Sequence, residues 1–253
     1  MKYVQSAKNP QVKQWKKLQT KKERENSGTY IVEGFHLVEE ALRYKEVIKE
    51  VLVKEGVDLP STWNIDEVSV ITLSEDAAKA VSATETSQGV FAVCYYTEER
   101  TFGLKGKTFL MLDEVQDPGN LGTIIRTADA AGIDIIILGE GTADLYNQKV
   151  LRSAQGSHFH LPIIKGDLQE WIPQLKNEGI PVYGTALENG VEYHTVSGSD
   201  SFALILGNEG NGVSPAILES TDQNLYVPIY GKSESLNVAI AAGILMYHLK
   251  KAQ

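Results

Sequence analysis

The sequence predicts an α/β protein in which a parallel sheet flanked by helices is preceded by a smaller α/β domain. From residue 108 onward, short strands alternate with helices, which is the order that builds a parallel sheet. These strands are continuously apolar, as in sheets that are covered on both faces. A polar, Gly-containing stretch separates the two parts. We therefore predict a first domain at 1–97, a linker at 98–107 and a second domain at 108–253.

The first domain begins with a predicted helix over 9–25. Asn9 is a good N-cap, Pro10 suits the first helical position, and three apolar residues spaced by three form one narrow stripe. Apolar patterns then predict a strand at 29–34 and an amphipathic helix at 35–44. Further strands are predicted at 48–56, 69–74 and 89–96.

The second domain continues with the same alternation to the end of the chain. Strands are predicted at 108–115, 133–139, 158–164, 180–187, 202–207 and 224–229, and helices at 120–132, 146–156, 167–179, 214–221 and 235–251. Ligands of parallel sheets bind beyond the carboxyl ends of the strands. The Gly-bearing segments that follow strands 108–115, 202–207 and 224–229 are therefore expected to converge on one site.

Composition excludes several classes of protein. The 253 residues are 42% hydrophobic and 23% charged, which is ordinary for a globular protein. The single cysteine, Cys94, rules out an internal disulfide and a Cys-based zinc site, and the histidines form no ligand pattern. The longest apolar stretch, 238–247, is shorter than the ~20 residues of a membrane span, and the N-terminus has no signal-like apolar region. We expect a cytoplasmic protein with neither a metal nor a membrane partner.

Charge is distributed unevenly along the chain. Residues 1–30 contain eight basic and two acidic residues, a net charge of +6, whereas the remainder contains 16 basic and 31 acidic residues, a net charge of −15. A basic segment on an acidic body favours local contact with a polyanion. A solvated helix face would look the same, and that alternative stays open. The candidate RNA-binding residues are Lys13, Lys16, Lys17, Lys21, Lys22 and Arg24.

Three Gly-rich segments resemble phosphate-binding loops without matching them. Residues 103–108 lack two residues of the P-loop spacing and precede a strand, and residues 139–144 have no third glycine. Residues 207–212 read G-x-x-G-x-G, which is the wrong order for a dinucleotide site. They also carry Glu209, whose carboxylate repels phosphate. Glycines here more plausibly allow a neutral or cationic ligand to approach the backbone, which argues against a nucleotide-dependent enzyme.

Segments 113–132, 205–214 and 227–244 together resemble the three signature motifs of SpoU/TrmH-type RNA 2′-O-ribose methyltransferases, in the SPOUT superfamily. The N-terminal segments 8–18 and 30–42 are similar to the substrate-binding domain of that family. The resemblance implies a C-terminal trefoil knot, an S-adenosylmethionine (AdoMet) site and a homodimer. It also implies methyl transfer to a ribose of RNA, with rRNA as the expected substrate and tRNA as the alternative. Periodicity alone would not suggest a knot, because threaded chains are very rare.

The resemblance also assigns site residues. It implies that Arg126 is the principal catalytic residue; its guanidinium can bind a phosphate bidentately, whereas a pKa above ~12 argues against a general base. A surface ion pair is the alternative. Asn120 can cap the helix that follows it or contact the ligand. Glu209 is expected to hold the motif together, to orient Arg126 or to face the cationic end of AdoMet. Ser235 is expected to cap the last helix, and with Asn237 to contact substrate or cofactor.

Cofactor contacts in this family come largely from backbone groups, and the resemblance transfers them to Thr185, Gly207, Val227, Ile229 and Leu236. A non-catalytic RNA-binding or ribosome-assembly protein that keeps the fold is the competing hypothesis. The complete set of Asn120, Arg126, Glu209, Ser235 and Asn237 argues against it.

Overall fold

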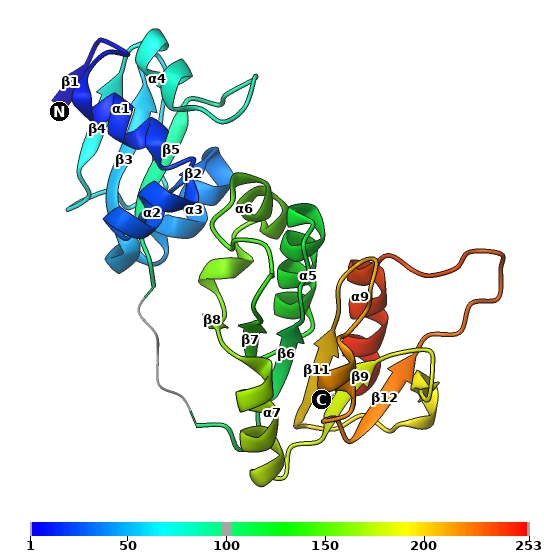
Figure 1. Ribbon diagram of the computed structural model, residues 1–253. Coiled ribbons are helices and arrows are strands. Elements are labelled where there is room, and N and C mark those ends of the chain that lie inside the picture. The colour runs from blue at the N-terminus through cyan, green and yellow to red at the C-terminus, as the bar shows by residue number, and fades with distance from the viewer. Residues whose placement is uncertain (1, 98–102, 252–253) are drawn as a thin grey trace. The chain divides into compact units, whose positions relative to one another are not determined.

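The computed structural model describes residues 2–97 and 103–251, which form two compact units (Figure 1). The first unit holds the N-terminal residues together with the later segment Tyr146–Phe159, and the second unit holds the rest. The predicted linker 98–107 lies partly outside the described residues. The predicted α/β class with a parallel, helix-flanked sheet is confirmed in the second unit.

The first unit is built on a five-stranded mixed sheet with the order β1-β4-β3-β5-β2. Its β3 pairs in parallel with β4 and antiparallel with β5. The strands are β1 (Lys2–Val4), β2 (Thr29–Glu33), β3 (Ile48–Lys54), β4 (Val70–Leu73) and β5 (Val90–Tyr95). The helices are α1 (Pro10–Lys17), α2 (Lys21–Ser27), α3 (Phe35–Leu42), α4 (Glu75–Val81) and α6 (Gln148–Ala154), with short 3-10 turns η1 (Lys45–Val47) and η2 (Ser157–Phe159).

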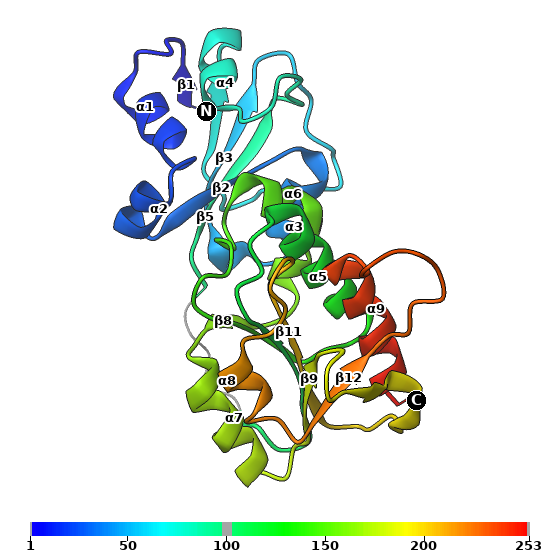
Figure 2. The same cartoon turned by 45° about the vertical axis from the view of Figure 1, so that its right-hand side comes forward.

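Helices cover both faces of this sheet (Figure 2). On one face Val12 and Trp15 of α1 pack with Ala77 of α4, and on the other Val38 of α3 packs with Leu151 of α6. The predicted helix 9–25 is two helices, α1 and α2, separated by a break at Leu18–Thr20. Asn9 caps α1 as predicted, because its side chain accepts a hydrogen bond from the amide of Gln11.

The second unit is built on a seven-stranded sheet with the order β10-β12-β9-β11-β6-β7-β8, and all its pairs are parallel. The strands are β6 (Thr108–Leu112), β7 (Ile135–Leu138), β8 (Ile163–Lys165), β9 (Val182–Thr185), β10 (Val191–Glu192), β11 (Phe202–Leu206) and β12 (Gln223–Tyr226). The helices are α5 (Pro118–Ala130), α7 (Leu168–Asn177), α8 (Pro215–Leu218) and α9 (Val238–Leu249), with the 3-10 turn η3 (Tyr193–Thr195).

The order of strands places the last part of the chain beside the first part of this unit. β11 lies between β9 and β6, so the loops after β6 and β11 leave the sheet side by side. Helix α9 packs beside α5 in both views (Figures 1 and 2). Asn237, just before α9, contacts Asn120 near the start of α5, and Tyr247 contacts Ala130 at its end, so the two helices run parallel. The three motif segments thereby meet at one edge of the sheet.

Candidate active site

The loop after β11 is folded back on itself. The backbones of Asn208 and Gly212 exchange two hydrogen bonds of 2.9 Å. A Cβ atom on Gly207 would lie 2.1 Å from the backbone of Gly212 and of Val213, so no other residue fits there without moving the loop. Gly207 therefore serves close approach of backbone to backbone, whereas the sequence predicted that these glycines let a ligand approach the backbone.

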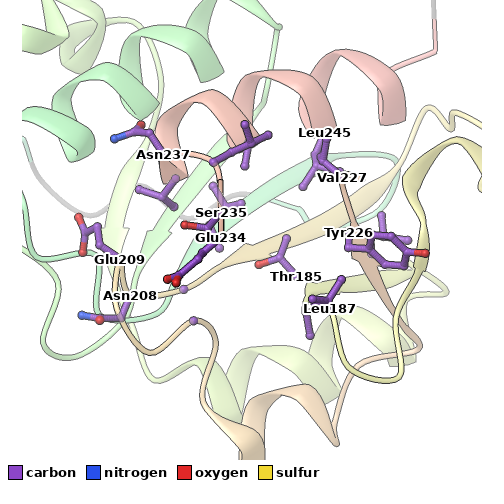
Figure 3. A pocket seen from close by; sticks show the side chains of 18 of the residues that line it. Thr185, Leu187, Asn208, Glu209, Tyr226, Val227, Glu234, Ser235, Asn237 and Leu245 are labelled. Carbon is purple, nitrogen blue, oxygen red and sulfur yellow. The ribbon is translucent and has the colours of Figure 1, made fainter. Parts of the chain in front are cut away.

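A pocket of about 570 Å³ lies where the carboxyl ends of β9, β11 and β12 meet the start of α9 (Figure 3). It is lined by residues of 185–187, 206–212, 225–229 and 234–245. The structure brings all five predicted cofactor contacts to its wall: Thr185, Gly207, Val227, Ile229 and Leu236. Its position beyond the strand ends is the expected place for a ligand of a parallel sheet.

Glu209, at the edge of this pocket, is the centre of a hydrogen-bond network. Its Oε1 accepts hydrogen bonds from the amide of Asp117 and from the side-chain amide of Asn120, both at 3.0 Å, and its Oε2 accepts one at 3.1 Å from the amide of Gln116. Partial burial raises the pKa of Glu209, but these hydrogen bonds lower the pKa more, so the net shift is downward. Glu209 therefore holds the loop after β11 to the start of α5.

Asn120 extends the network to the last helix. Its Oδ1 accepts a hydrogen bond of 2.9 Å from the side-chain amide of Asn237. Two capping expectations need correction: Asp117, not Asn120, caps α5, and Asn237, not Ser235, caps α9. Ser235 lies three residues before α9 begins and lines the pocket instead. Asn120, Glu209 and Asn237 thus join three segments that are far apart in the sequence.

Arg126 lies on α5 with its side chain exposed. It is not one of the residues that line the pocket. Within the described chain it has no ion-pair partner within 4 Å, so the alternative of a surface salt bridge finds no support. The structure leaves its guanidinium available to a ligand.

The predicted RNA-binding lysines are exposed on α1 and α2, at Lys13, Lys16, Lys17, Lys21 and Lys22. Arg24 differs and needs correction, because its side chain is only 2% exposed. Its Nη1 donates a hydrogen bond of 2.8 Å to the carbonyl oxygen of Leu18, which ties α2 to the end of α1. A phosphate could not reach a guanidinium buried in this way.

The pocket suits AdoMet better than a nucleotide phosphate. Leu225, Val227 and Leu245 offer apolar surface for an adenine ring, and the backbone around Gly207 is open to a ligand. The charged side chains that line it are two carboxylates, Glu209 and Glu234, which favour a cation. The sequence analysis did not identify Glu234, Leu187 and Tyr226 as pocket residues. Only Glu234 could have been found in the sequence, because it is next to the predicted site residue Ser235.

Other kinds of site are not found in the described part of the chain. No group of three histidine, cysteine or acidic side chains there could hold a metal ion. Among the same residues, no helix combines the length and apolar character needed to cross a membrane.

Comparison with known proteins agrees with this geometry. Residues 107–247 match the model of the SpoU rRNA Methylase family, and residues 9–92 match the MRM3-like substrate binding domain. The 23S rRNA (guanosine(2553)-2′-O)-methyltransferase RlmP of Bacillus subtilis strain 168 is 56% identical over 250 residues, which cover 99% of this chain and 100% of the relative.

Solved structures of similar proteins share the fold over nearly the whole chain. The AdoMet-bound rRNA methyltransferase from Sinorhizobium meliloti has a TM-score of 0.88 and 31% identity, covering 98% of this chain and 97% of that one. An RNA 2′-O ribose methyltransferase has a TM-score of 0.83 and 26% identity, covering 98% and 97%. With its pocket and its motif residues in place, the chain belongs to the SpoU rRNA Methylase family and is an AdoMet-dependent methyltransferase.

Proposed function

We propose that this protein methylates the ribose 2′-hydroxyl of one guanosine in 23S rRNA, the position named for its relative from B. subtilis. The observation that carries the proposal is the joining of Asn120, Glu209 and Asn237 by hydrogen bonds beside the pocket. The identity of 56% over the full length of that relative supports the choice of substrate.

Methyl transfer from AdoMet to a ribose hydroxyl depends more on the alignment of the reacting atoms than on a strong base. AdoMet supplies a methyl group on a positively charged sulfur; the carbon–sulfur bond breaks, its electron pair stays on sulfur, and an oxygen–carbon bond forms. The hydroxyl of the target ribose must lie in line with that carbon. We assign Arg126 the role of holding a phosphate of the target nucleotide. The proton of the hydroxyl then passes to an RNA phosphate or to water, since a guanidinium does not accept it.

The remaining site residues hold the two ligands in place. Backbone groups at Thr185, Gly207, Val227, Ile229 and Leu236 are proposed to bind AdoMet, because these residues line the pocket. Ser235, which also lines it, is proposed to contact the cofactor or the target ribose through its hydroxyl. Glu209 fixes the geometry from the pocket edge through Asn120.

The first domain is proposed to bind RNA. We propose 1–97 as the RNA-binding domain, 98–107 as the linker and 108–253 as the methyltransferase domain, which the family matches at 9–92 and 107–247 support. Segment Tyr146–Phe159 is the exception, because it packs with the first unit. The exposed lysines of α1 and α2 are proposed to contact phosphates, which gives sequence-independent affinity. Arg24 is removed from this set because it is buried.

Three further properties are proposed from the family. They are a trefoil knot formed by the C-terminal segment, a homodimer, and a location in the cytoplasm. For the dimer, the support is apolar surface on α9: Ile240 is 56% exposed and Tyr247 is 61% exposed. Both occupy one side of the helix, seven residues apart, whereas its buried residues are Ala239, Ala242, Leu245, Met246 and Leu249.

Mapping of ribose methylation in total RNA tests the proposed activity. RNA from cells with and without the protein would be compared at every nucleotide. We expect one guanosine of 23S rRNA to lose its 2′-O-methyl group when the protein is absent. A methyl group lost from tRNA instead, or no change in any RNA, would contradict the proposal.

A further inference from the structure

The two carboxylates that line the pocket are in different situations. Both oxygens of Glu209 accept hydrogen bonds from the start of α5. Glu234 is exposed and, within the described chain, has neither an ion pair nor a side-chain hydrogen bond. In Figure 3 its side chain is directed toward the interior of the pocket, whereas Glu209 lies at the margin. Glu234 is thus the charged group that a ligand in this pocket would meet.

The chain around Glu234 is held on its C-terminal side. The hydroxyl of Ser233 donates a hydrogen bond of 3.0 Å to the carbonyl oxygen of Ser235. Asn237 is fixed by its capping bonds to α9 and by its bond to Asn120. The backbone that carries Glu234 is therefore joined to the start of α9 through Asn237, which keeps this residue at the pocket wall.

Charge is the chief chemical difference between the methyl donor and its product. AdoMet carries a sulfonium, an ammonium and a carboxylate, a net charge of +1. After methyl transfer the sulfur is a neutral sulfide, and S-adenosylhomocysteine has a net charge of zero. A carboxylate in the pocket wall stabilises the donor relative to the product, because its attraction to the sulfonium is lost in the reaction.

We propose that Glu234 is the residue by which this pocket distinguishes the cationic donor from the neutral product. The inference rests on the proposed binding of AdoMet in the pocket. A carboxylate without a protein partner keeps its full charge for the ligand, whereas Glu209 is already neutralised in part by its donors. Weaker binding of the product would also speed its release after each turnover.

The test is isothermal titration calorimetry on the full-length protein with three probes. These are AdoMet, S-adenosylhomocysteine, and an AdoMet analogue in which a protonated amine replaces the methylsulfonium. The variant is Glu234→Gln, which keeps the size of the side chain and removes its charge. Glu219→Gln is the matched control, because Glu219 is exposed on the same unit and does not line the pocket.

We expect Glu234→Gln to weaken the binding of AdoMet and of the amine analogue by about tenfold, which is the effect of losing one partly solvated charge pair. The binding of S-adenosylhomocysteine should weaken by less than about twofold. Glu219→Gln should change none of the three. Equal weakening of all three probes by Glu234→Gln, or no weakening of any, would overturn the role of Glu234. Failure of the wild-type protein to bind any probe would instead refute the proposed cofactor site, so the two failures are distinct.

Discussion

Glu209 accepts hydrogen bonds from residues that precede it by 89 to 93 positions in the chain. Asn120 and Asn237, which are 117 positions apart, continue the connection. Each of these bonds fixes a backbone segment relative to another, so three loops are held at the pocket by side chains with complementary donors and acceptors. A change at any one of them should loosen two segments at once.

Replacing Glu209 by Gln tests this network at the level of stability. The pKa of Glu209 is lowered in the folded protein, so its ionised form stabilises the fold above the unfolded pKa of about 4.3 and ceases to do so as pH falls through the lower folded pKa. We expect Glu209→Gln to reduce the free energy of unfolding by about 1 kcal/mol at pH 7. Urea unfolding of the wild type and the variant measures the difference in their free energies of unfolding at pH 7 and at pH 3. This difference should shrink at pH 3, and an equal difference at both pH values would contradict the stabilising role of ionised Glu209.

Replacing Arg126 by Ala tests catalysis apart from cofactor binding. Arg126 does not line the pocket, so AdoMet should bind with unchanged affinity. Loss of its contact with a target phosphate should lower the rate of methyl transfer by about 100-fold or more. Calorimetry and a radiolabelled methyl-transfer assay measure the two effects. Turnover at the wild-type rate would refute the assigned role.

The sequence predicted the pocket wall better than the cap positions. Thr185, Gly207 and Leu236 all reach the pocket, since each lies at the end of a strand or just before a helix. Ser235 and Asn237 are both good caps two residues apart, and the structure selects Asn237, whose side-chain oxygen accepts hydrogen bonds from the amides of Ala239 and Ile240. The burial of Arg24 was also beyond a sequence argument, because it depends on the break between α1 and α2.

At the scale of elements, the loop after β11 is the most tightly constrained part of the site. Gly207→Ala would place a Cβ atom 2.1 Å from backbone atoms, whereas the nearest neighbour of a Cβ on Gly210 would be 3.6 Å away. We expect Gly207→Ala to destabilise the protein by about 1–3 kcal/mol and to weaken AdoMet binding more than about tenfold. Thermal unfolding and calorimetry test this, with Gly210→Ala as the matched control; equal effects of the two would contradict the steric argument.

Helices α1 and α2 carry the proposed contact with RNA. Replacing Lys16, Lys17, Lys21 and Lys22 by Ala should weaken RNA binding and reduce its salt dependence, by up to ~0.9 in the logarithmic slope for each lost phosphate contact. Filter binding at several salt concentrations measures both. A control variant at Lys45, Lys49, Lys105 and Lys165 removes the same charge from outside these helices. An equal loss of RNA affinity in the control variant would contradict a specific role of α1 and α2 in RNA binding.

Most elements were predicted, and those that were missed or misplaced are short. Helix α4 was not predicted, and the predicted strand 158–164 begins in the 3-10 turn η2, with strand β8 only at Ile163–Lys165. Strands β1 and β10 have three and two residues, too few for a hydrophobic period to be visible. Helix α6 was predicted as a helix, but its packing was not, since periodicity shows an apolar face without showing its partner. That partner is the core of the first unit, where Leu151 is buried.

At the scale of the whole molecule, the proposed homodimer makes a prediction. Ile240→Asp would put a charge on the exposed apolar side of α9 and should convert a dimer into a monomer, because burying an unpaired carboxylate costs several kcal/mol. Size-exclusion chromatography with light scattering measures the mass, and Ile240→Val serves as the apolar control. A wild-type protein that is already monomeric would refute the proposed dimer.

The packing of segment Tyr146–Phe159 with the first unit has a consequence for how such proteins arise and can be engineered. The chain leaves the first unit after residue 97, returns at Tyr146 and leaves again after Phe159. A gene cut once between the two units would deprive the N-terminal product of α6 and leave the side chains around Val38 without Leu151. Recombination at a single crossover therefore cannot exchange the first unit, the proposed RNA-binding unit, intact. Transplanting it requires the short insert of α6 to be moved with it.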